Sequence, residues 1–117
     1  MSMLANSSTL KEIAKPYLGE YECEQALYGD KAYLDNFEYI RIELRSDNTY
    51  VLSAKEKQSG RKTRVEGEYS YDENRKEITF QMGNNAYIKR KFMLKNGVLL
   101  MVTTFGNKVL QIEFRQK

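Results

Sequence analysis

Arg90 is the residue of this sequence whose position points most directly to chemistry. It stands between Ile88 and Phe92 in a run where every second residue is apolar, so an extended chain turns its guanidinium toward the side of those two residues. A buried guanidinium is costly without a partner, and a carboxylate can pair with it through two parallel hydrogen bonds. The pattern predicts an anion-binding role for Arg90. Two other interpretations stay open: the strand turns Tyr87 and Met93 inward instead, or Arg90 caps the end of the structure.

Tyrosines at alternating positions accompany this arginine. The sequence has nine tyrosines and five phenylalanines but no tryptophan. Phenol hydroxyls need hydrogen-bond partners when they are buried, which indicates a partly polar interior. We expect such an interior to hold the polar head of a ligand against the arginine and tyrosines, and its apolar tail against hydrophobic side chains. The predicted ligand-binding residues are Arg90, Tyr21, Tyr50, Tyr69, Phe80, Phe92 and Met101.

Several kinds of chemistry are missing from the chain. It contains no histidine, which removes the usual general base at neutral pH and the commonest transition-metal ligand. Its one cysteine, Cys23, allows neither an internal disulfide nor a Cys-x-x-Cys site, and we interpret it as a buried filler. Glu20, Glu22 and Glu24 alternate along one strand, an arrangement that suits ion pairs with a neighbouring strand better than a metal site. We therefore predict no catalysis, no metal and no cofactor.

The elements that must position these residues follow a period of two. Turn dipeptides such as Asn96-Gly97 and Gly106-Asn107 separate the runs. Strands joined in series by tight turns bury their apolar sides by curling and closing. The sequence therefore predicts an all-β fold, an eight-stranded antiparallel up-and-down meander barrel. The alternating runs cover residues 19–24, 39–45, 50–54, 65–71, 78–82, 88–94, 98–105 and 110–115.

The remaining segments complete a single domain over residues 1–117. Thr9 and Glu12 have the spacing of a capping box, and Pro16 discourages continuation, so we predict a short helix over 9–16 lying against the barrel mouth. We expect residues 1–8 to be disordered and residues 25–36 to form a loop over an opening. Gly67, inside a strand, marks either a corner of the barrel or a gap that leaves room for a ligand.

This layout resembles the lipocalin and fatty-acid-binding superfamily, the calycins, and in particular its short bacterial lipocalin-like members. The resemblance covers about residues 9–117 and includes Gly19-Glu20-Tyr21, which stands where lipocalins have Gly-x-Trp. It implies that Arg115 takes the part of the basic residue packing across that aromatic ring, and that an inward arginine binds a carboxylate. The chain also resembles copper-resistance lipoproteins with a small barrel, although it lacks their Cys-x-x-Cys.

These observations predict non-catalytic binding of a small amphipathic or hydrophobic, fatty-acid-like ligand inside the barrel. The alternative is a filled barrel that acts as a protein-interaction or dimerisation module through outward residues such as Leu100 and Val102. No run is long enough to span a bilayer, the net charge is only +3, and no signal sequence is evident, so we expect a cytoplasmic protein that binds no nucleic acid.

Overall fold

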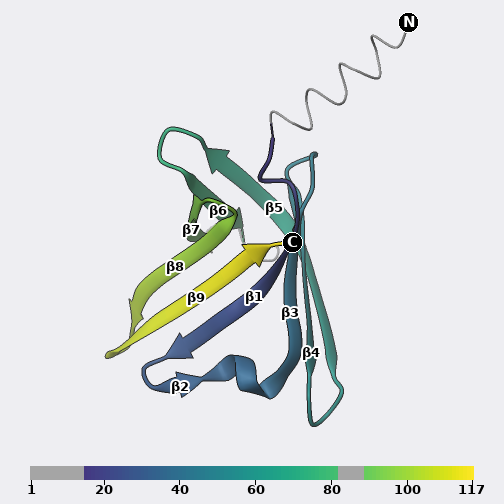
Figure 1. The fold of residues 1–117 in the computed structure, drawn as a ribbon, viewed down its shortest axis with the longest axis vertical. Helices are drawn as coiled ribbons and strands as arrows, with labels where there is room; N and C mark the ends of the chain where they lie inside the picture. Colours follow the sequence, from purple (N-terminus) through teal and green to yellow (C-terminus); the bar gives the residue numbers. More distant parts are fainter. Residues whose placement is uncertain (1–14, 82–88) are drawn as a thin grey trace, which may run out of the picture.

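A computed structural model describes residues 15–81 and 89–117, which form one continuous antiparallel sheet (Figure 1). The strands are β1 (Gly19–Tyr28), β2 (Lys31–Ala32), β3 (Phe37–Leu44), β4 (Thr49–Glu56), β5 (Lys62–Asp72), β6 (Glu77–Gln81), β7 (Lys89–Lys95), β8 (Val98–Phe105) and β9 (Lys108–Gln116), with a 3₁₀ turn η1 (Tyr33–Asn36) before β3. Each long strand pairs with the next, and β9 returns to pair with β1. The sheet is therefore a closed barrel.

The predicted eight-stranded meander barrel is confirmed, with the two-residue β2 as an addition on the edge of β1. Asn96 and Gly97 both have positive φ, of 51° and 77°, as the predicted tight turn between β7 and β8 requires. Most of the predicted helix lies outside the described residues, and so do residues 82–88, which contain the predicted strand ends at residues 82 and 88. The described end of that helix, residues 15 and 16, belongs to a turn that continues to Leu18. No helix in the described ranges has the length and apolarity that crossing a membrane takes.

The predicted loop over residues 25–36 is wrong in its first part, because β1 continues through a β-bulge to Tyr28. Tyr21 and Cys23 face the interior, but the pairing with β9 shifts register after Cys23, so that Ala26 and Tyr28 continue on the inner side. One extra residue thus changes which positions point inward, and the simple alternation is lost. The strand continues to Tyr28 instead of ending at Glu24. Only the β1–β2 turn and η1 interrupt the chain before β3.

Ion pairs cover the outer side of the junction between β9, β1 and β3. Arg115 Nε donates to Glu24 at 2.8 Å, and Lys117 Nζ lies 2.8 Å from Glu22. Arg41 lies 3.6 Å from Glu22, as predicted for these glutamates, whereas the Arg45 guanidinium pairs with Glu43 on its own strand. All of these pairs are partly exposed to solvent, so we assign them to register and solubility more than to stability.

Aromatic side chains fill the interior of the barrel. Tyr50 packs edge-on against Phe80 with ring centroids 5.0 Å apart, Phe80 against Phe92 at 5.4 Å, and Phe92 against Phe114 at 6.1 Å. These contacts run across the barrel from β4 to β9. The predicted inward residues largely belong to this core, and β8 turns Leu99 and Met101 inward. The centre is thus a packed core, one of the two outcomes open to an eight-stranded barrel.

Gly67 marks the place where β5 leaves β4 and joins β6. The pairing with β4 ends at Glu68, and the pairing with β6 begins at Tyr69. The Tyr50 ring fills the space beside Gly67, and its hydroxyl donates to the Gln81 carbonyl at 2.8 Å. Of the two interpretations of Gly67, the one that left room for a ligand does not hold, because the Tyr50 ring occupies the space beside it.

Gly67→Ala should destabilise the barrel. An added Cβ would lie 2.8 Å from the Tyr50 ring and 2.7 Å from the Gln81 carbonyl oxygen, so either the ring or the strand must move. We expect the free energy of unfolding to fall by about 1–3 kcal/mol, as for other overpacked sites. Urea unfolding measures this, with the exposed neighbour Glu68→Ala as the matched control. Equal stability of Gly67→Ala and the wild type would contradict the packing described.

Candidate functional site

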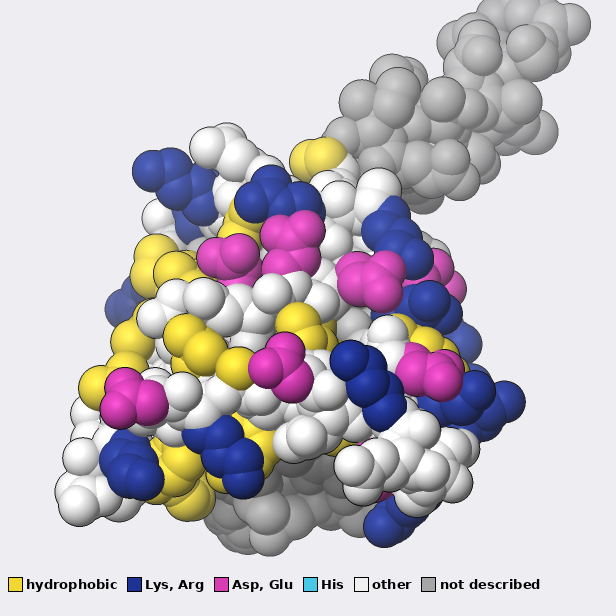
Figure 2. All heavy atoms as spheres, turned by 60° about the horizontal axis from the view of Figure 1, so that its bottom comes forward, with side chains coloured by type: hydrophobic (Ala, Val, Ile, Leu, Met, Phe, Trp, Pro, Cys, Tyr) yellow, Lys and Arg dark blue, Asp and Glu magenta, His cyan; other side chains and the backbone are white. Residues whose placement is uncertain are grey.

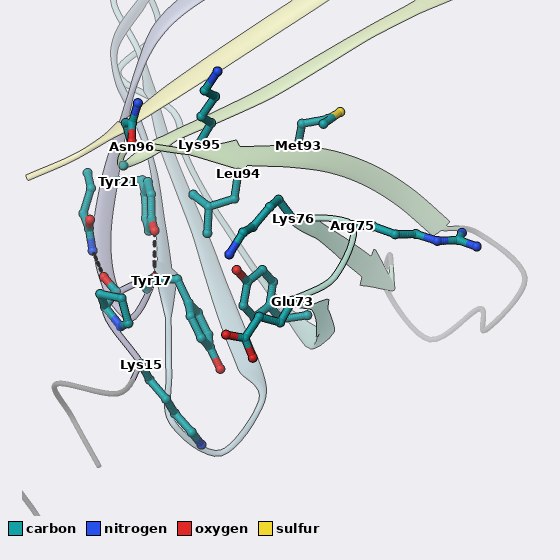
Figure 3. Close-up of a pocket in the computed structure, with 14 residues that line it drawn as sticks. Lys15, Tyr17, Tyr21, Glu73, Arg75, Lys76, Met93, Leu94, Lys95 and Asn96 are labelled. Atoms are coloured by element: carbon teal, nitrogen blue, oxygen red, sulfur yellow. Dashed lines mark hydrogen bonds between the residues drawn. The ribbon is translucent and has the colours of Figure 1, made fainter. Parts of the chain in front are cut away.

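One end of the barrel, here called the capped end, is covered by the turn Lys15–Leu18. Gln116 Nε2 donates to the carbonyls of Pro16 at 2.7 Å and Leu18 at 2.9 Å, which fixes the turn to the last strand. The Tyr17 ring packs on Tyr71 with centroids 4.5 Å apart. A pocket of about 890 Å³ remains between this turn and the β5–β6 and β7–β8 turns (Figure 3).

Cations and a carboxylate share the wall of the capped-end pocket. Figure 3 shows the Tyr17 hydroxyl and the Glu73 carboxylate on the same side, with Lys76 reaching toward them and Arg75 pointing away. Glu73 also raises the pKa of Tyr17, after burial and the neighbouring Tyr71, in keeping with its closeness to that phenol. The pocket therefore carries charges of both signs, with Lys15, Arg75, Lys76 and Lys95 lining it together with Glu73.

The hydroxyls of the buried tyrosines donate hydrogen bonds to backbone carbonyls. Tyr21 Oη donates to the Tyr17 carbonyl at 2.7 Å, and Tyr69 Oη donates to the Arg45 carbonyl at 2.7 Å. Tyr50 does the same toward Gln81. The predicted hydrogen-bond partners of these hydroxyls are thus backbone carbonyls, and each bond ties a turn or a strand end to the core.

The other end, here called the open end, is where β7 and β8 separate. These strands pair only at Met93–Leu100, Leu94–Leu99 and Lys95–Val98, whereas β8 pairs with β9 along its whole length. The facing edges of Lys89–Phe92 and Met101–Phe105 are therefore not paired with each other. A pocket of about 720 Å³ lies here, lined by Tyr28, Tyr33, Lys89, Arg90, Lys91, Met101, Val102, Thr103, Phe105 and Leu110.

Arg90 lies in this open-end pocket and not in the centre of the barrel. It pairs with Phe80 and has the inward parity of Phe92, but it is exposed, and its Nη1 donates to the Lys89 carbonyl at 2.9 Å. The prediction of a buried guanidinium is wrong. Alternation along a strand determines which side of the sheet a residue faces, but it does not determine whether the residue lies at the middle of the barrel or at its end. The structure agrees with the interpretation that Arg90 caps the barrel end.

The other predicted ligand residues separate into three groups. Met101 joins Arg90 in the open-end pocket, while Tyr21 lines the capped end. Tyr50, Tyr69, Phe80 and Phe92 are packed in the core between them. Sequence reasoning missed Lys89 and Lys91, although three consecutive cations in one strand were a usable signal that this part of β7 reaches solvent on both sides.

Cys23 behaves as the buried filler that the sequence predicted. It is 6% exposed, and its Sγ donates to the Gln25 carbonyl at 3.4 Å. Burial is the main cause that raises the pKa of this thiol to about 11, so it stays protonated at neutral pH. Within residues 15–81 and 89–117 no three carboxylate or thiol side chains are grouped closely enough to hold a metal ion.

Comparison with known protein families gives a match to the NlpE N-terminal domain over residues 39–111, which is more than half of the chain. The chain belongs to the NlpE N-terminal domain family. The match begins in β3 and ends in β9, so it contains β7, β8 and the open-end pocket between them. No curated protein shows significant similarity to the chain.

Membership of the NlpE N-terminal domain family supports the barrel but does not name the lipocalins. One feature implied by the lipocalin resemblance is also wrong. Arg115 points to the outer side and pairs with Glu24 instead of packing across Tyr21. The residue opposite Tyr21 is Gln116, which holds the capping turn through amide hydrogen bonds.

The buried tyrosines make the barrel sensitive to alkali. Burial raises the pKa of Tyr21 and Tyr69 above the ordinary value of 10.0, so above pH 10 the folded barrel holds protons that the unfolded chain releases. Stability is therefore full below pH 10 and falls as the pH rises beyond it. Urea unfolding at increasing pH should show this decline. Tyr21→Phe should flatten it, and the exposed Tyr33→Phe is the matched control; a decline unchanged in Tyr21→Phe would contradict the assignment.

Proposed function

We propose that this barrel is a non-catalytic binding protein for a small amphipathic anion, such as a fatty acid, and that the ligand occupies the open-end pocket instead of the barrel centre. The observation that carries the proposal is the asymmetry of the pocket wall. Lys89, Arg90 and Lys91 lie on the β7 side, and Met101 and Leu110 lie opposite. Such a wall matches a ligand with one charged and one apolar part.

The cations of β7 are available to a ligand. Within the described residues no carboxylate pairs with any of these three side chains, although most other arginines of the barrel are ion-paired. The Arg90 guanidinium uses one N–H on the Lys89 carbonyl and can turn others toward a carboxylate. The acyl chain would lie against Met101, Leu110 and Tyr28.

A second candidate function is interaction with another protein, including a second copy of this chain. The packed interior favours it, and so do exposed hydrophobic side chains on the outer side of β8. Val102 is 57% exposed and adjoins the partly exposed Leu100 two residues away. Light scattering of the wild type and Leu100→Lys across a dilution series tests self-association through this side.

Arg90→Gln should weaken binding of a fluorescent fatty acid by about tenfold or more, because a charge-assisted pair is lost while the pocket keeps its shape. Arg75→Gln at the capped end removes the same charge and is the matched control, expected to bind like the wild type. The methyl ester of the probe should bind weakly to all three proteins because it lacks the anion. Fluorescence titration measures each affinity.

Three outcomes of this titration would overturn the proposal. They are an absence of binding by the wild type, equal affinity of Arg90→Gln and the wild type, and a loss of affinity in Arg75→Gln instead. The last result would move the site to the capped end.

A further inference from the structure

We infer that the open end of the barrel docks on an anionic lipid bilayer through a rim of aromatic, aliphatic and basic side chains. This rim is formed by the β1–β2 turn, η1 and the β8–β9 turn, and it borders the pocket described above without depending on a ligand there. Its members are Tyr28, Lys31, Tyr33, Phe105, Lys108 and Val109.

The aromatic part of the rim is held in place by contacts between the two turns. Tyr28 Oη donates to the Phe105 carbonyl at 2.8 Å, and the Tyr28 ring lies 6.5 Å from Phe105 and 6.4 Å from Tyr33. Lys31 Nζ lies 4.8 Å above the Tyr33 ring, and Lys108 Nζ 5.6 Å above the Tyr28 ring. Rings and ammonium groups therefore form one fixed cluster.

Two hydrophobic side chains of this rim are exposed. Phe105 is 61% and Val109 51% exposed. Both lie on the β8–β9 hairpin, which extends beyond the last pairing of β8 with β7. Exposed apolar groups at the tip of a rigid hairpin suit insertion at the boundary between head groups and acyl chains, where tyrosine rings are also favoured.

The charge of the open end complements an anionic surface. In the described part of the chain no carboxylate pairs with Lys31 or Lys108, and the pocket adds Lys89, Arg90 and Lys91 beside them. The carboxylates of this edge, Asp30 and Asp35, are outnumbered. Figure 2 shows hydrophobic side chains and Lys or Arg side chains at the lower left of the face, with an Asp or Glu side chain beside them, on the side where β2 and the β8–β9 turn lie in Figure 1.

A bilayer fits these side chains better than a nucleic acid does. Phosphate groups of either partner would attract the lysines, but Val109 and Phe105 offer aliphatic and apolar surface that a phosphate backbone does not use. Each lysine near an anionic membrane adds roughly the same increment of attraction, and salt weakens it. The rim therefore predicts binding that needs both anionic lipid and the apolar side chains.

Co-sedimentation of the full chain with vesicles tests the inference. The wild type should bind vesicles that contain phosphatidylglycerol, bind poorly to phosphatidylcholine alone, and lose binding as salt is raised. The triple variant Lys31→Gln, Lys108→Gln, Val109→Ser should bind about tenfold less or weaker still. The triple variant Lys76→Gln, Lys95→Gln, Met93→Ser makes the same changes of charge and apolarity at the capped end and should bind like the wild type.

A reporter confirms which end meets the lipid. The chain has no tryptophan, so Val109→Trp introduces a single indole whose emission should shift to the blue on adding anionic vesicles, while Met93→Trp should not shift. Equal loss of binding in both triple variants, binding to phosphatidylcholine alone, a shift of the Met93→Trp reporter only, or binding to an oligonucleotide without binding to vesicles would overturn the inference.

The two proposals fail separately. Lys31, Lys108 and Val109 do not line the open-end pocket, so the rim variant should still bind the fluorescent fatty acid, and Arg90→Gln keeps every residue of the rim. Vesicle binding without fatty-acid binding would leave the membrane inference standing and remove the proposed function. Fatty-acid binding without vesicle binding would do the reverse.

Discussion

The closure of the sheet between β1 and β9 is the constraint on which the rest of this structure depends. A single strand must meet β3 on one side near its start and β9 on the other along most of its length. The bulge after Cys23 makes this possible, because it bends the strand and keeps apolar side chains inward on both sides of the shift. Without it, Gln25 and Leu27 would face inward in place of Ala26 and Tyr28, and a polar side chain would enter the core.

The packed interior determines where function can lie. Tyr50, Phe80, Phe92 and Phe114 meet across the barrel, and the buried tyrosine hydroxyls are all used on backbone carbonyls. No central space is left for a ligand among these residues. A small ligand would therefore lie at one end of the barrel. The two ends differ: the capped end is covered by a turn and has Glu73 among its cations, whereas at the open end two strands separate and none of the described residues that line the pocket is a carboxylate.

The sequence predicts the architecture well because its signals are local. Period-two alternation and the Asn96-Gly97 turn each report on a few neighbouring residues, and the barrel follows from their order. The bulge in β1 could not be predicted in this way, since Gln25–Tyr28 alternate with the opposite parity. The partners of the tyrosine hydroxyls could not be predicted either, because the accepting carbonyls of Gln81 and Arg45 are distant in sequence from Tyr50 and Tyr69.

The candidate site was found in part, through Arg90 and Met101. The position of the site at the end of the barrel depends on how many residues of β7 pair with β8, and no local sequence pattern predicts that number. Consecutive cations were the one sign that this part of β7 reaches solvent.

The short ladder of paired residues between β7 and β8 also means that local stability differs around the barrel wall. Three residue pairs hold this seam, whereas eight hold β8 to β9. The barrel wall should therefore open first at this seam, while the pairing of β8 with β9 stays intact. Amide protons on either side of the seam should then exchange with solvent long before those of β1 and β9. A molecule that contacts both β7 and β8 at this seam would therefore stabilise the part of the barrel that opens most easily.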